Sequence, residues 1–145
     1  GSLISPKMYA ELVLPSYDPL LRALRENGVK TIIWRSYANP RMLLPAVFAE
    51  HRFDGLWACE TNPIDMDYRA IRREVGGHFA IIGGIDVDWL YGDPDSIPVH
   101  LEKTVIPLLE QGRYIPLADG RVREGIPYPH YVVYRQALER LVGTP

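Results

Sequence analysis

The sequence lacks the features that mark disulfide-rich, membrane-spanning and nucleic-acid-binding proteins. Its 145 residues include one cysteine, Cys59, which can form neither an internal disulfide nor, alone, a cysteine-rich zinc site. No apolar run approaches the roughly 20 residues that a membrane helix needs. Sixteen Lys and Arg are balanced by 18 Asp and Glu, giving a net charge of −2, so the chain has no basic field for nucleic acid.

The composition is that of an ordinary globular domain, with 47% hydrophobic and 23% charged residues. Gly1 and Ser2 resemble a tag remnant, and we treat 3–145 as one domain. No signal peptide pattern follows them. We therefore expect a soluble, cytoplasmic protein that has no membrane or nucleic-acid partner.

Four short apolar segments, at 30–35, 54–59, 79–85 and 113–118, predict β-strands. The first has β-branched and aromatic residues without alternation, which predicts a strand buried on both faces. Helices are expected between and around the strands from capping residues, prolines and glycines. A first helix begins at Ser5-Pro6, is kinked or broken at Pro15 and ends at Asn27-Gly28. The others run from 39–40 toward 51, from 65 or 67 to about 75, from 93–96 to 111, and from about 129 to 141.

This order of elements predicts an α/β protein whose four parallel strands are joined by right-handed helical crossovers. A complete (β/α)₈ barrel needs about 250 residues, so the chain holds about half of one. Four parallel strands would leave two unpaired edges, and the face toward the barrel interior would lack its partners. The chain then pairs with another copy, belongs to a longer protein, or forms an open flavodoxin-like sheet. The last would need helices on both faces and a glycine in the loop at 36–39, which has none.

Three segments, in order, match motifs of one known superfamily. Residues 3–17 resemble its helix with an LSP-x-x-Y start followed by LPY, and Gly83-Gly84-Ile85-Asp86 resembles its G-[GN]-[IL]-D strand end. Residues 112–115, 119–120 and 126–131 resemble its last strand, loop and helix. By these segments the chain resembles the uroporphyrinogen decarboxylase superfamily over nearly its whole length, and the resemblance implies the C-terminal half of a (β/α)₈ TIM barrel whose first half precedes Leu3.

The resemblance implies two alternative chemistries, carboxy-lyase action in porphyrin biosynthesis without a cofactor, and corrinoid-linked methyl transfer with zinc. Arg35 and Tyr37 stand where the methyltransferases have His and Cys, and Asp119 stands where they have the last Cys. Because Arg stays protonated, zinc activation of a thiol is not expected, and we expect no metal or other cofactor. Asp119 also replaces the histidine that the decarboxylases have after the eighth strand.

Candidate site residues follow the predicted strands, because barrel active sites gather at the carboxyl ends of strands. Asp119 and Glu60 are the candidate catalytic residues, as acceptors or donors of a proton. Asp119 could instead hold its turn, and Glu60 could instead begin a helix. The candidate substrate-binding residues are Arg35, Tyr37, Asp86 and Arg121.

Each candidate binding residue also has a structural alternative. Arg35 could clamp a carboxylate or pair internally with Glu60 or Asp86. Asp86 could cap the next helix, although Asp88 is the residue for which we favour that role. Tyr37 could stack on a flat ligand or lie at the rim.

Arg121 lies in a loop, 119–125, that could close over an anionic substrate or remain a solvated charged loop. Cys59 is interpreted as a buried core thiol.

Three hypotheses follow for the function. The first is a decarboxylase-like enzyme domain that binds a carboxylated, tetrapyrrole-like small molecule. The second is a corrinoid- or folate-linked methyltransferase of the same superfamily without the zinc ligands. The third is a non-catalytic half-barrel that self-associates. The expected protein partner is accordingly either a second copy, giving a homodimer, or the missing N-terminal half.

Overall fold

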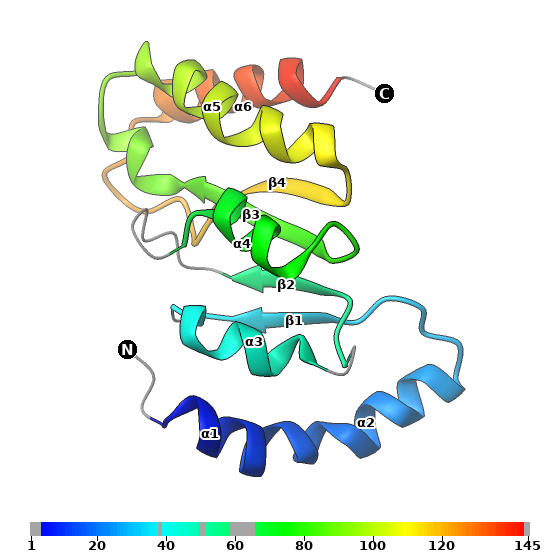
Figure 1. Cartoon of the computed structure of the whole chain (residues 1–145). Helices are drawn as coiled ribbons and strands as arrows, with labels where there is room; N and C mark the ends of the chain where they lie inside the picture. Colours follow the sequence, from blue (N-terminus) through cyan, green and yellow to red (C-terminus); the bar gives the residue numbers. More distant parts are fainter. Residues whose placement is uncertain (1–3, 38, 50–51, 59–65, 144–145) are drawn as a thin grey trace.

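The computed structural model describes residues 4–37, 39–49, 52–58 and 66–143. These residues form an α/β fold with a four-stranded parallel sheet flanked by helices (Figure 1). The strands lie in sequence order, β1-β2-β3-β4, and each pair of neighbours is parallel. Their bounds are Ile33–Ser36 for β1, Gly55–Ala58 for β2, Ala80–Asp86 for β3 and Tyr114–Asp119 for β4.

Helical segments precede the first strand and follow every strand. Before β1 the chain forms α1, a π-helical turn η1, and α2; after β1 it forms the 3₁₀ turn η2 and α3. After β3 the 3₁₀ turn η4 leads into α5. The bounds are Pro6–Met8 (α1), Tyr9–Val13 (η1), Leu14–Glu26 (α2), Arg41–Leu43 (η2), Leu44–Val47 (α3), Tyr68–Val75 (α4), Val87–Tyr91 (η4), Ser96–Gln111 (α5) and Tyr128–Val142 (α6).

The helix ends follow the capping residues of the sequence. The Ser5 hydroxyl accepts a hydrogen bond from the Met8 amide, and Asp67 caps α4 by accepting from the Arg69 amide. At the end of α2, Gly28 adopts a φ of 83°, which suits glycine. The irregularity expected at Pro15 takes the form of the π-helical turn η1, which ends just before the first turn of α2.

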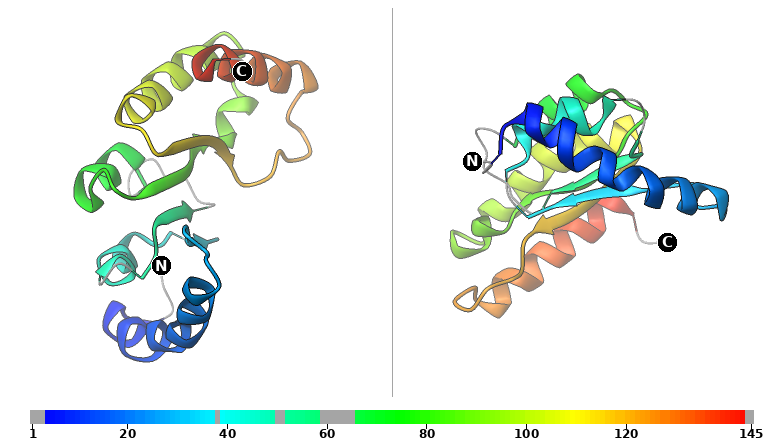
Figure 2. Two further views of the ribbon diagram at one scale, coloured as in Figure 1. Left: turned by 90° about the vertical axis from the view of Figure 1, so that its right-hand side faces the viewer. Right: turned by 90° about the horizontal axis from the view of Figure 1, so that it is seen from below.

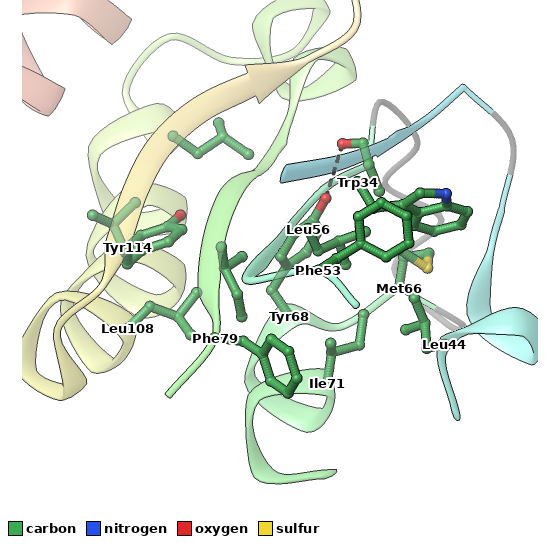
Figure 3. Close-up of a cluster of buried hydrophobic side chains, with 14 of the residues drawn as sticks. Trp34, Leu44, Phe53, Leu56, Met66, Tyr68, Ile71, Phe79, Leu108 and Tyr114 are labelled. Atoms are coloured by element: carbon green, nitrogen blue, oxygen red, sulfur yellow. Dashed lines mark hydrogen bonds between the residues drawn. The ribbon is translucent and has the colours of Figure 1, made fainter. Parts of the chain in front are cut away.

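One face of the sheet carries the hydrophobic core. Trp34, Leu56, Ile81 and Tyr114 are aligned in register across the four strands and are buried against the helical layer. Figure 3 shows the rings and aliphatic side chains of this cluster drawn from the strands, α4 and α5. Core packing is thus concentrated on the helix-covered side.

The opposite face is open. On this face, Arg35, Trp57, Ile82 and Ile115 are aligned in register across the four strands, and Ile115 is 58% exposed. The expectation that the first strand is buried on both faces is therefore wrong. Trp34 points into the core while Arg35 is exposed, because no helix of the described residues covers the second face.

The helices gather on one side of the sheet, which Figure 2 (left) shows nearly end-on. Since the strands follow one another in space as in sequence, every crossover runs in the same direction. Right-handed crossovers then place all of the helices on the same side. A flavodoxin-like sheet requires a reversal of strand order and helices on both faces, and the described residues have neither. β1 and β4 are the two edges of the described sheet, as the sequence predicted.

At the amino ends of the strands, a buried arginine ties the loops together. Arg72 of α4 is 2% exposed, and its guanidinium donates hydrogen bonds to four carbonyl oxygens, those of Gly77, Phe79, Gly112 and Arg113. Phe79 immediately precedes β3 and Arg113 immediately precedes β4. Burial lowers the pKa of Arg72 from its ordinary value, and the nearby charge of Arg113 adds to this effect.

None of the helices in the described ranges combines the length and the apolar character that crossing a bilayer requires.

Candidate functional site

A pocket of about 340 Å³ lies on the open face at the carboxyl ends of the strands. β1 contributes Arg35, with Tyr37 directly after it, and β2 contributes Trp57. The remaining wall comes from β4 and the loop that follows it. The lining residues are Arg35, Tyr37, Trp57, Leu117, Ala118, Gly120 and Arg121.

The strand geometry explains why these residues meet. Arg35 and Trp57 are register partners on neighbouring parallel strands, so their side chains leave the same face of the sheet. Tyr37 lies two residues beyond Arg35. The Arg35 guanidinium carbon lies 4.4 Å from the Tyr37 ring centroid and 4.1 Å from that of Trp57. Both distances are within the range of cation–π attraction.

This stacking holds the Arg35 guanidinium without using its hydrogen-bond donors. A ring contact occupies the flat surface of the guanidinium, whereas its five N–H groups lie in the plane. Within the described ranges no hydrogen bond or ion pair uses those donors, and the pairing of Arg35 with Asp86 considered from the sequence is not formed. The Arg35 guanidinium is therefore held by aromatic rings, and Arg35 lines the pocket.

Arg121 adds a second positive charge to the same pocket. Its side chain also forms no ion pair with a carboxylate in the parts of the chain that the structure describes. Two arginines, two aromatic rings and Leu117 together make a wall that is cationic and partly apolar. Such a wall attracts an anion that also has a flat or apolar surface.

Asp119 is buried next to this pocket and does not line it. It is 3% exposed, and each of its two carboxylate oxygens lies 3.1 Å from the backbone nitrogen of Gly84, which donates to them. The carboxylate therefore fastens the end of β4 to β3. The structure does not test the catalytic role assigned to Asp119 from the sequence, which stays a prediction.

The two glycines of the Gly83-Gly84 motif make room for these contacts. Their φ angles are 115° and 87°, a region that disfavours side chains. A Cβ on Gly83 would lie 2.3 Å from an Asp119 carboxylate oxygen. The Tyr114 hydroxyl donates to the Gly83 carbonyl over 2.8 Å, and burial, followed by the charge of Asp119, raises the pKa of Tyr114.

Asp86 lies elsewhere, in a smaller pocket of about 120 Å³ that it lines with Tyr68, Trp89, Thr104 and others. Its carboxylate accepts a hydrogen bond from the Asp88 amide over 2.9 Å and so caps η4. Burial raises the pKa of the Asp86 carboxyl above its ordinary value. The capping role that we favoured for Asp88 belongs to Asp86.

The loop after β4 is anchored on η4. Arg123 lies 3.8 Å from the Asp88 carboxylate, and the Tyr91 hydroxyl donates to the Glu124 carbonyl over 3.3 Å. These contacts separate the roles of the loop arginines. Arg121 lines the pocket, whereas Arg123 holds the loop.

The residues that stand where the resembled methyltransferases have their zinc ligands do not suit zinc. Arg35 has no lone pair to offer a metal, Tyr37 stacks on it, and the oxygens of Asp119 accept from Gly84. Across 4–37, 39–49, 52–58 and 66–143, no three His, Asp or Glu side chains form a group that could hold a metal ion.

The structure thus brings three of the six predicted site residues together: Arg35, Tyr37 and Arg121. Asp119 lies behind the pocket and Asp86 lines a different one, while Glu60 and Cys59 lie outside the described residues.

Trp57 was missed, because it looked like one more apolar residue of a buried strand. Trp57 is the third residue of β2 as Arg35 is of β1, and this register, which pairs the two, is not visible in the predicted strands at 30–35 and 54–59. Searches against protein-family models and against curated proteins match nothing.

Proposed function

We propose that this chain is the C-terminal half of a (β/α)₈ barrel of the uroporphyrinogen decarboxylase superfamily. Its open-face pocket would bind a carboxylated, flat substrate of the tetrapyrrole type. In the intact barrel the reaction is that of a carboxy-lyase, in which a carbon–carbon bond breaks, carbon dioxide leaves and a proton takes its place.

One observation carries the proposal: Arg35 and Arg121, neither of them in an ion pair with a described residue, share a pocket with the rings of Tyr37 and Trp57. A guanidinium fork matches the geometry of a carboxylate and can bind it through two parallel hydrogen bonds. The aromatic rings offer flat surfaces for a conjugated or macrocyclic ligand. The pocket therefore suits a ligand that is both anionic and flat.

The fold supports the same proposal. The strand order is sequential, the helices lie on one side, and the pocket is at the carboxyl ends of the strands. Active sites of (β/α)₈ barrels occupy this end, because the loops that follow the strands converge there. Arg35 and Arg121 would bind carboxylates that the substrate retains. Asp119 and Glu60 stay the predicted acid–base groups.

No observation favours the methyltransferase alternative. Its chemistry depends on a metal-bound thiol, and Arg35, Tyr37 and Asp119 do not provide the ligands for one. We therefore carry the carboxylate-binding proposal forward alone.

A binding titration tests the proposal with the chain as it exists. Uroporphyrin, the stable oxidised form of the macrocycle, carries carboxylates and is fluorescent, so its quenching reports binding directly. A tetracationic porphyrin with N-methylpyridyl groups is the matched ligand control, because it has the same ring and the opposite charge. We expect saturable binding of uroporphyrin and no binding of the cationic porphyrin.

Substitution of Arg35 locates the binding. Arg35→Ala should weaken uroporphyrin binding by at least about tenfold, since a charge-assisted hydrogen bond contributes about 1.5–3 kcal/mol. The exposed Arg73→Ala on α4 serves as the control for loss of one positive charge, and its affinity should be unchanged. Equal binding of both porphyrins, or equal affinity of Arg35→Ala and the parent chain, would refute the proposal.

A further inference from the structure

A second pocket lies apart from the open-face pocket, between the carboxyl end of β3 and three helical elements. Its volume is about 120 Å³, and its lining includes Asp86 of β3, Tyr68 of α4, Trp89 of η4 and Thr104 of α5. Asp86, Trp89 and Thr104 are each half-buried, so a small molecule can reach them from solvent. Within the described ranges the two pockets share no lining residue. A role for this pocket therefore goes beyond the proposed function and does not depend on it.

Asp86 gives this pocket a negative charge that no ion pair balances. One of its oxygens accepts from the Asp88 amide, and Asp86 forms no ion pair in the parts of the chain that the structure describes. The nearby Arg123 guanidinium lies 3.8 Å from the Asp88 carboxylate instead. Burial outweighs the surrounding charges and raises the pKa of the Asp86 carboxyl. A cation bound beside this carboxylate would replace part of the hydration that it has lost.

The two other charged residues of the lining neutralise each other. The Arg69 guanidinium donates hydrogen bonds to both oxygens of the Asp67 carboxylate, over 3.0 and 3.2 Å. The unbalanced charge of the lining is therefore negative, and it is located at Asp86.

Two aromatic rings of the same lining are held in place by contacts of their own. The Trp89 indole stacks on the His100 imidazole, with ring centroids 4.8 Å apart and planes inclined by 21°. The Tyr68 hydroxyl donates to the Ala58 carbonyl over 2.9 Å. These rings need little further ordering when a ligand binds. Because indole is the side chain that attracts cations most strongly, a carboxylate beside a fixed indole selects a cation with a flat surface.

The size of the pocket limits which cation fits. A cavity of about 150 Å³ holds benzene, so a pocket of about 120 Å³ takes a smaller group. A guanidinium is smaller and planar, and its parallel N–H groups match the two oxygens of a carboxylate. It also stacks on indole rings, as the Arg35 guanidinium does at 4.1 Å from the Trp57 ring centroid. An ammonium has the charge but neither the fork nor the flat surface.

We infer that the pocket lined by Asp86 and Trp89 binds a small guanidinium compound. The Asp86 carboxylate accepts two N–H groups of the ligand, because each of its oxygens has two lone pairs and the Asp88 amide uses one of them. The Trp89 indole packs against the flat surface of the ligand, and the Thr104 hydroxyl is a further acceptor in the lining. Asp86 thus binds a ligand opposite in charge to that of the open-face pocket.

A nuclear magnetic resonance titration of the full chain with methylguanidinium tests this site. The chain has three tryptophans, and Trp89→Phe identifies the indole N–H signal of Trp89. Methylguanidinium should shift this signal saturably at millimolar concentrations, far below those at which guanidinium salts unfold proteins. The signals of Trp34, in the core, and Trp57, in the open-face pocket, should not move.

Two further probes separate charge from shape. Methylurea has nearly the shape of methylguanidinium without its charge, and it should give no saturable shift of the Trp89 signal. Methylammonium keeps the charge without the planar fork, and it should bind at least about fivefold more weakly than methylguanidinium.

Matched substitutions locate the binding. Asp86→Asn keeps an oxygen for the Asp88 amide but loses the charge, and it should weaken methylguanidinium binding at least about tenfold. The exposed Asp95→Asn, just before α5, should leave the affinity unchanged. Thr104→Leu fills the pocket while Asp86 stays intact, and it should also weaken binding about tenfold, whereas Thr104→Ala should keep the affinity within about threefold. Circular dichroism checks that each variant is folded.

Three results would overturn the inference: equal shifts with methylurea, a shift of the Trp57 signal in place of the Trp89 signal, or parental affinity in folded Asp86→Asn or Thr104→Leu. Loss of binding in either of these folded variants, with binding kept in Asp95→Asn, would support it. Uroporphyrin takes no part in the test, so failure of this site is distinguishable from failure of the open-face pocket.

Discussion

At the amino ends of the strands, the guanidinium of Arg72 is buried and donates to four carbonyl oxygens. At the carboxyl ends, the guanidinium carbon of Arg35 lies 4.4 Å from the Tyr37 ring centroid and 4.1 Å from that of Trp57, and Arg35 forms no ion pair with a described residue. The same chemical group is thus used in two ways. Arg72 satisfies backbone groups of the fold, whereas neither Arg35 nor Arg121 forms an ion pair with a described residue, and both line the open-face pocket.

The comparison explains why charge alone does not identify a site. A buried cation that replaces its lost hydration with backbone acceptors stabilises the chain, and its removal leaves those acceptors without donors. A stacked cation at an open pocket contributes little to folding, because water solvates it in either state. Stability and ligand binding should therefore respond to substitutions at opposite ends of the sheet.

The largest loss of stability is expected from substitution of Arg72, at the amino ends of the strands. Arg72→Met should lower the free energy of unfolding by about 3–5 kcal/mol, because several buried carbonyls would lose their donors while the apolar stem remains. Arg73→Met, at an exposed position of the same helix, is the control. Urea unfolding followed by circular dichroism measures both. Similar losses in the two variants would show that the four hydrogen bonds are not what Arg72 contributes.

The second largest loss of stability is expected at Gly83, in the Gly83-Gly84 motif that contacts Asp119. Gly83→Ala places a Cβ 2.3 Å from an Asp119 oxygen at a φ of 115°, and it should cost about 2–3 kcal/mol of stability. Gly77→Ala, where nothing lies within 4 Å of the added Cβ, should change stability by less than about 1 kcal/mol. Unfolding curves in urea test the difference. A tolerated Gly83→Ala would mean that Asp119 is free to move.

Much of the fold was predictable from the sequence, because its signals are local. Ser5 and Asp67 cap helices where the sequence places them, and Gly28 and Gly76 end them. The four strands lie within a few residues of the predicted runs. The two-sided burial of the first strand was wrong, because the sequence shows that a side chain is apolar but not whether anything covers it.

The candidate site was predictable only in part. Position at the strand ends led to Arg35, Tyr37 and Arg121, which share a pocket. The same rule also selected Asp119 and Asp86, whose carboxylates accept from the Gly84 and Asp88 amides. A sequence specifies which residues follow a strand, whereas the partner that each side chain finds depends on register between strands distant along the chain.

A smaller, pH-dependent effect is expected at Asp86. Burial raises the pKa of this carboxyl above its ordinary value of 3.8, so the folded chain binds more protons than the unfolded chain in the window between the two pKa values. Stability contributed by this group therefore falls as the pH rises through that window and is constant above it. Asp86→Asn keeps an oxygen to cap η4 and cannot ionise.

Urea unfolding across a pH series, from below 3.8 to neutral, compares the two chains. Asp86→Asn should gain stability relative to the parent as the pH rises through the window. The exposed Asp95→Asn serves as the control for loss of one negative charge, and it should show no such gain. A parent chain that becomes relatively more stable with rising pH would contradict the assignment to burial.

The smallest effect on stability is expected at Arg121. This substitution therefore best tests whether the amino ends of the strands serve folding and the carboxyl ends serve ligand binding. Arg121→Ala removes an exposed side chain that forms no ion pair within the described residues. The free energy of unfolding should therefore change by no more than about 0.5 kcal/mol. Uroporphyrin affinity should nevertheless fall, as in Arg35→Ala. Arg72→Met should keep that affinity when binding is measured without urea, at a temperature where the variant remains folded. An arginine that changed both quantities together would show that folding and binding are not divided between the two ends of the sheet.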